Sequence, residues 1–154
     1  YRMSDLEAAL GMAQLKKAGR FLKRREEIAS FYQEAFQGMR TLTIPGVLEG
    51  VRPAWQIYVL ALRLERLKAD RLEILNALRA ENIGVDVHYP PVFLQPYFVW
   101  KGHKDICTLE GSLCPRAEDL YQTFISLPVF PAMTDRDAED VVEAVKKVVT
   151  YYSK

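Results

Sequence analysis

The sequence predicts an α+β fold in which a small sheet is backed by helices on one side. Helix-like and strand-like segments alternate along 154 residues, a length that suits one ordinary domain. Hydrophobic residues make up 49% of the chain and charged residues 27%, which excludes wholesale disorder and allows a packed core. The net charge of +1 supplies no global field for holding nucleic acid or an anionic membrane, so we expect neither partner.

The first segment has the pattern of a long helix. Ser4 and Glu7 have the spacing of a capping box, and apolar residues recur at helical spacing as far as Phe36. A continuous helix over 4–37 would be about 50 Å long, which exceeds the diameter of so small a domain. We therefore expect this helix either to bend near Gly19 or to pack against something outside this chain.

The rest of the chain alternates between extended and helical segments. Aromatic and β-branched residues indicate the first strand, Asp70 and Thr134 are placed to cap two helices, and Pro115 opens another. We see no repeat or linker and expect a single domain. In order, the expected segments are turns over 41–53, a strand over 54–64, a helix over 70–81, a short strand over 85–88, an irregular stretch over 89–114, a helix over 115–124, a strand over 125–127 and a helix from 134 to 149.

The cysteines do not form a recognisable metal site. Cys107 and Cys114 are separated by six residues and lie near His103, but this spacing fits no standard zinc pattern. The alternative is a buried thiol that packs as a small apolar group. We therefore predict no metal ligands, and two cysteines favour a reducing, cytoplasmic setting.

A basic run follows the start of the first helix. On a helical wheel its cations share one face, opposite Phe21 and Leu22. A nucleic-acid stripe is one interpretation, but Glu26 and Glu27 and the overall neutrality favour a solvated face or a contact with an acidic partner. The cations on this face are Lys16, Lys17, Arg20, Lys23 and Arg24.

The segment Val85 to Pro91 (VDVHYPP) is the most unusual local sequence. The prolines place His88 and Tyr89 in an extended conformation at the end of a strand. Imidazole and phenol groups can both hydrogen-bond to phosphate or sugar oxygens. The equal alternative is a packed His-Tyr corner beneath the aromatic residues that follow. No nucleophile or orienting base accompanies them, so we assign no catalytic residue to this chain.

Four motifs run in order through nearly the entire chain. They are YRMSDLEAALGMAQL (1–15), AWQIYVL (54–60), IGVDVHYPPVFLQPYF (83–98) and SLPVFPAMTDRDAEDVVEAV (126–145). Together they resemble the DegT/DnrJ/StrS family of pyridoxal-phosphate (PLP)-dependent aminotransferases, which act on nucleotide-linked keto sugars.

This resemblance implies a C-terminal small domain of the aspartate-aminotransferase (fold type I) architecture over 1–154, entered by the connecting helix 4–37. It implies PLP as the cofactor of the full-length parent, a nucleotide sugar and an amino-acid donor such as glutamate as substrates, and a homodimer with shared active sites. The large PLP-binding domain with its Schiff-base lysine would precede Tyr1, so this chain alone would be inactive and would bind no PLP covalently.

The resemblance also assigns binding roles to four residues. Tyr1 and Arg2 would lie beside the cofactor phosphate, for which the planar guanidinium is a suitable partner. His88 and Tyr89 would approach the substrate. At position 56 this chain has glutamine, where relatives often carry histidine. This difference bears on the identity of the sugar. Two alternatives stay open: a regulatory domain that kept the fold without catalysis, and a related PLP-dependent sugar dehydratase.

Overall fold

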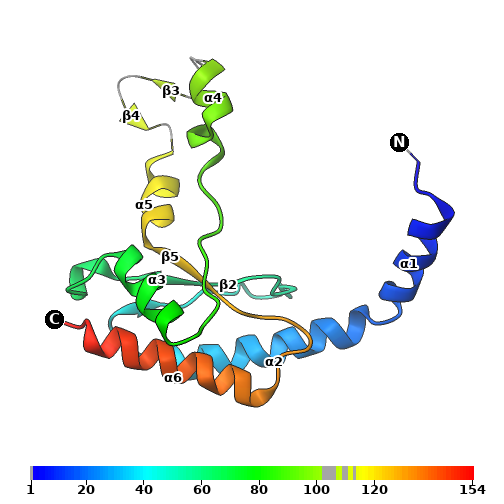
Figure 1. The fold of residues 1–154 in the computed structure, drawn as a ribbon, viewed down its shortest axis with the longest axis horizontal. Coiled ribbons are helices and arrows are strands. Elements are labelled where there is room, and N and C mark those ends of the chain that lie inside the picture. Colours follow the sequence, from blue (N-terminus) through cyan, green and yellow to red (C-terminus); the bar gives the residue numbers. More distant parts are fainter. Residues whose placement is uncertain (1, 102–106, 109–110, 113) are drawn as a thin grey trace.

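Three helices, α2 (Ala18–Phe36), α3 (Arg71–Ala80) and α6 (Asp135–Tyr151), share one hydrophobic core with a small sheet in the computed structural model (Figure 1). The structure describes residues 2–101, 107–108, 111–112 and 114–154. The sheet is antiparallel, in the order β1 (Leu42–Thr43), β2 (Tyr58–Leu62), β5 (Phe124–Leu127). The predicted α+β class is confirmed.

The register of the sheet sorts its residues between two faces. Tyr58 and Leu60 of β2 alternate with Val59, and they lie opposite Leu127 and Ile125 of β5. Because side chains alternate along a strand, these four side chains share one face. All four are buried against the helices, and this face is the inner side of the core.

The predicted capping residues begin their helices as expected. In each case the cap side chain accepts a hydrogen bond from the backbone N–H of the third helical residue. The carboxylate of that third residue accepts a hydrogen bond from the backbone N–H of the cap residue. Hydrogen bonds from Ser4 lower the pKa of Glu7, and those from Thr134 lower the pKa of Asp137. The three pairs are Ser4 and Glu7, Asp70 and Glu73, and Thr134 and Asp137.

Helix α3 ends at Ala80 with Glu81 as its C-cap, close to the predicted end at residue 81. Asn82 takes the left-handed conformation with φ of 63°, which asparagine tolerates better than most residues. The Ile83 N–H then donates to the Leu78 carbonyl at 3.0 Å, the bond that closes a Schellman motif.

The long N-terminal helix is broken rather than continuous over 4–37. Helix α1 (Asp5–Leu15) ends at Lys16, and α2 begins after Lys17, close to the bend expected near Gly19. Figure 1 shows α1 pointing away from the axis of α2 and from the rest of the chain. None of its residues is buried within this chain.

Three strand expectations need correction. The strand expected over 54–64 is limited to β2, because Arg25 binds the carbonyls of Trp55 and Gln56 and Trp55 has a φ of 47°. Segment 85–88 forms only an isolated bridge between Asp86 and Ser126 instead of a strand. The turn-rich segment 41–53 contributes β1, which is too short to leave a periodic signal.

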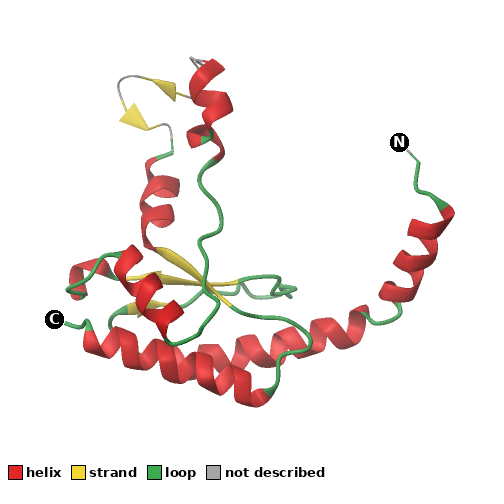
Figure 2. Cartoon of the chain, viewed as in Figure 1, coloured by secondary structure: helices red, strands yellow, loops and turns green. Residues whose placement is uncertain are grey.

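The stretch expected to be irregular, 89–114, contains short regular elements. After a 3₁₀ turn over Val92–Leu94 it forms α4 (Pro96–Lys101), β3 (Cys107–Thr108) and β4 (Gly111–Ser112). Helix α5 (Pro115–Thr123) then leads into β5 as predicted. This arm extends from the sheet on the side opposite α2 and α6 (Figure 2). In the described ranges, no helix is both long and apolar enough to cross a membrane.

Candidate functional site

The loop that carries His88 and Tyr89 is anchored at its start. Asp86 exchanges two backbone hydrogen bonds with Ser126 of β5, at 3.3 and 2.8 Å. The guanidinium of Arg79 on α3 donates to the Val85 carbonyl at 3.2 and 3.3 Å. The loop therefore leaves the edge of the sheet in a fixed direction.

His88 and Tyr89 differ in their exposure and hydrogen bonding. Their rings meet edge to face, with centroids 4.8 Å apart, and Tyr89 is 72% exposed. His88 is partly buried, and its Nδ1 atom is inaccessible to solvent yet has no hydrogen-bond partner among the described residues. Buried polar atoms almost always have partners, so this unpaired Nδ1 is an exception within the described chain.

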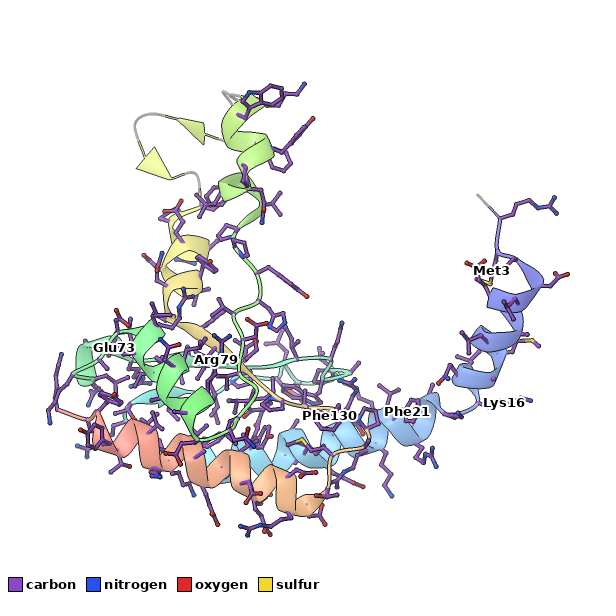
Figure 3. The ribbon with its side chains drawn as sticks, viewed as in Figure 1. Met3, Lys16, Phe21, Glu73, Arg79 and Phe130 are labelled. Carbon is purple, nitrogen blue, oxygen red and sulfur yellow. The ribbon has the colours of Figure 1, made fainter. Side chains whose placement is uncertain are left out.

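The N-terminal residues lie elsewhere in the fold. Arg2 is exposed in the segment before α1, while Tyr1 falls outside the described residues. Figure 3 labels the neighbouring Met3, which lies at the far end of α1, well away from the sheet. One chain therefore does not bring Arg2 together with His88 and Tyr89.

No group of three or more metal-ligating side chains is found in the part of the chain that the structure describes. Of the residues weighed for a metal site, His103 lies outside the described residues. Cys114 is exposed just before α5.

The basic run does not form a uniform solvated face. Arg24 is held in the structure: its Nε and Nη2 donate to the Met133 carbonyl at 3.0 and 2.8 Å, and Nη2 pairs with Asp135 at 2.8 Å. Lys16, Lys17, Arg20 and Lys23 are exposed. The predicted face is therefore correct for four cations and wrong for Arg24, which joins α2 to the start of α6.

Sequence reasoning missed the role of Arg25. Its Nη1 lies within 3.0 Å of the carbonyls of Trp55, Gln56 and Val129. It thus joins α2 to the segment before β2 and to the loop after β5. The sequence carries no signal for this, because an arginine that follows five other cations in a basic run has the pattern of a surface residue.

A second link on this side is ionic. Arg52, in the loop between β1 and β2, binds both carboxylate oxygens of Glu26 at 2.5 and 3.0 Å. This hydrogen bonding lowers the pKa of Glu26. Gln56, which departs from the family pattern, is exposed in the same loop, just before β2.

Comparison with known proteins places this geometry in context. The chain is 43% identical over 148 residues to the spore coat polysaccharide biosynthesis protein SpsC of Bacillus subtilis, a match that covers 96% of this chain and 37% of SpsC. Among solved structures it is similar to DesV of S. venezuelae, with 27% identity and a TM-score of 0.81 over 95% of this chain and 36% of DesV.

The PLP form of Spr1654 from Streptococcus pneumoniae shares the fold, with a TM-score of 0.83 and 24% identity over 97% of this chain and 36% of that protein. This chain spans 38% or less of the length of the curated relatives it matches first. The model of the DegT/DnrJ/EryC1/StrS aminotransferase family matches residues 1–146. The chain belongs to the DegT/DnrJ/EryC1/StrS aminotransferase family.

Proposed function

We propose that this chain is the C-terminal part of a PLP-dependent aminotransferase that transfers an amino group from an amino acid such as glutamate to a nucleotide-linked keto sugar, in polysaccharide or amino-sugar biosynthesis. The family match over residues 1–146 carries the proposal. The part played by SpsC in spore coat polysaccharide biosynthesis supports the pathway, and the PLP form of Spr1654 supports the cofactor.

The large domain of the parent would pack against α1. Apolar side chains of this helix are exposed along its length, including Leu6, Leu10 and Leu15, each more than 60% exposed. Large apolar side chains exposed on a helix that buries none of its residues within its own chain are typical of an interface. The connecting segment 4–37 would thus join a large domain, which supplies the Schiff-base lysine, to the small domain described above.

The residues of this chain would bind and orient groups rather than react. When bound, PLP supplies the electron sink and carries the amino group. Arg2 has no ion-pair partner in the described chain, and its planar fork suits a phosphate. His88 and Tyr89 would approach the substrate, and the phenol of the exposed Tyr89 would hydrogen-bond to oxygens of the sugar.

We further propose a homodimer in which each site combines residues of two subunits. Met3, next to Arg2, lies at the far end of α1 (Figure 3), whereas the His88–Tyr89 loop leaves from the edge of the sheet. A compact site that uses both therefore needs Arg2 from one subunit and His88 from the other. The 154-residue chain by itself would not transaminate.

The test uses the longer protein that contains this chain and measures its two half-reactions separately. We expect His88→Ala to slow amino transfer to a nucleotide-linked keto sugar at least about tenfold and to leave the glutamate half-reaction within about twofold. Tyr89→Phe should act in the same direction, while Tyr151→Phe, an exposed tyrosine at the end of α6, serves as the matched control. No transfer to any nucleotide-linked keto sugar would contradict the proposal, as would equal loss in both half-reactions.

A further inference from the structure

The loop between β5 and α6 separates two grooves of opposite charge. One groove, of about 760 Å³, lies between α2 and this loop, and Arg20, Phe21, Lys23 and Phe130 line it. The other, of about 500 Å³, lies between the end of α3 and α6. Phe130 lines both grooves, so this exposed aromatic ring stands on the ridge between them.

The first groove carries net positive charge, because Arg20, Lys23 and Arg24 line it with a single carboxylate, Glu27. Arg20 stacks on the Phe21 ring at 5.7 Å and has no carboxylate partner in the described chain. Lys23 is 78% exposed and lies 3.9 Å from Glu27, a surface contact of little energetic value. Figure 3 shows Phe21 and Phe130 near each other along α2, with Lys16 farther toward α1.

The second groove is acidic. Asp137, Asp140 and Glu143 of α6 line it together with Glu81 and Lys147, which neutralise each other at 2.7 Å. Asp140 pairs with Arg136 at the surface, whereas Glu143 has no ion pair in the ranges described. The groove therefore presents negative charge on the side of Phe130 opposite Arg20 and Lys23.

The ridge that carries Phe130 is held firmly. Tyr32 donates to the Pro128 carbonyl at 2.9 Å, Arg25 to that of Val129 at 3.0 Å and Arg24 to that of Met133. Phe130 itself is 45% exposed between these fixed points. A rigid, exposed aromatic residue loses little conformational entropy when it is buried by a partner, as an interface anchor requires.

We propose that this surface, defined by Phe130 and its two flanking grooves, binds a second copy of this chain about a two-fold axis. In a two-fold interface each patch meets its own counterpart in the opposite direction. The basic groove of one copy then faces the acidic groove of the other, twice, and the two Phe130 rings meet near the axis. The arrangement is self-complementary, which identifies the partner as the chain itself. This contact is additional to the proposed sharing of active sites and does not depend on it.

Charge-swap variants of the 154-residue chain test this proposal by sedimentation velocity at about 100 µM protein, a concentration suited to a modest interface. One variant carries Arg20→Glu and Lys23→Glu, and the other carries Asp140→Lys and Glu143→Lys. We expect the unmodified chain to dimerise, more weakly at high salt, and each variant alone to dimerise at least about tenfold more weakly. An equal mixture of the two variants should dimerise again, because both contacts then regain opposite charges.

Two further variants separate this surface from α1 and from loss of folding. Leu10→Gln changes the exposed face of α1 and should leave dimerisation unchanged, whereas Phe130→Ser should weaken it while the circular dichroism spectrum stays the same. A monomeric unmodified chain would overturn the proposal. So would dimerisation that survives both charge swaps, or a mixture of the swapped variants that stays monomeric.

Discussion

Two tyrosines that contact each other in the core show how hydrogen bonding decides whether a buried hydroxyl stabilises the fold. Tyr32 and Tyr58 are both fully buried, with ring centroids 5.1 Å apart and edge to face. The Tyr32 hydroxyl donates to the Pro128 carbonyl at 2.9 Å, whereas the Tyr58 hydroxyl is buried without a partner in the described chain. Burial raises the pKa of both phenols, so both stay neutral.

This difference predicts opposite outcomes for the same substitution. Tyr32→Phe should lower the free energy of unfolding by about 1–2 kcal/mol, because the Pro128 carbonyl loses its donor. Tyr58→Phe should be neutral or stabilising, since it removes a polar group that makes no bond. Urea denaturation of both variants measures the difference. Equal destabilisation would show that the two hydroxyls are equally well bonded.

Helix α6 begins at a complete capping box formed by Thr134 and Asp137. The Thr134 hydroxyl accepts from the Asp137 backbone N–H at 3.1 Å and donates to its carboxylate at 2.8 Å. Thr134→Ala should lower the free energy of unfolding by about 1 kcal/mol. Thr150→Ala, in the exposed last turn of the same helix, should change it by less than about 0.5 kcal/mol. Thermal unfolding of the pair checks this, and a similar loss in both would contradict the capping role.

The same cap predicts a pH dependence. Hydrogen bonds from Thr134 lower the pKa of Asp137 in the folded chain, so its carboxylate stabilises the fold fully above the ordinary range of aspartate, about pH 4. That contribution is lost as the pH falls through the lowered folded value. The difference in unfolding free energy between the unmodified chain and Asp137→Asn should therefore be largest near neutral pH and shrink in acid. A difference in unfolding free energy that grows in acid would contradict the stabilising role of the Asp137 carboxylate.

The elements also show what the sequence can predict. Helices α3 and α6 were predictable because their caps and apolar spacing are local signals. Segment 54–57 was mistaken for strand because its conformation is set by Arg25, a residue thirty positions away. His88 and Tyr89 could be identified from local sequence and family resemblance, but only the folded chain shows that His88 Nδ1 is buried without a partner among the described residues.

In the whole molecule, the core does not include α1. Every residue of α1 is exposed or only partly buried, whereas α2, α3 and α6 all contribute buried side chains. The free energy of unfolding of a chain of residues 18–154 should therefore lie within about 0.5 kcal/mol of that of the 154-residue chain. Amides of α1 should also exchange with solvent faster than those of α6. A large loss of stability on truncation would mean that α1 packs within its own chain.

The proposed sharing of sites between subunits can be measured with hybrid dimers of the longer protein. Arg2→Ala and His88→Ala variants should each be nearly inactive alone. When subunits are exchanged in an equal mixture, half of the dimers are hybrids and one of their two sites has both native residues. We predict recovery of about a quarter of the unmodified sugar aminotransferase activity. No recovery, under conditions where mass spectrometry confirms hybrid dimers, would show that Arg2 and His88 serve a site within one subunit.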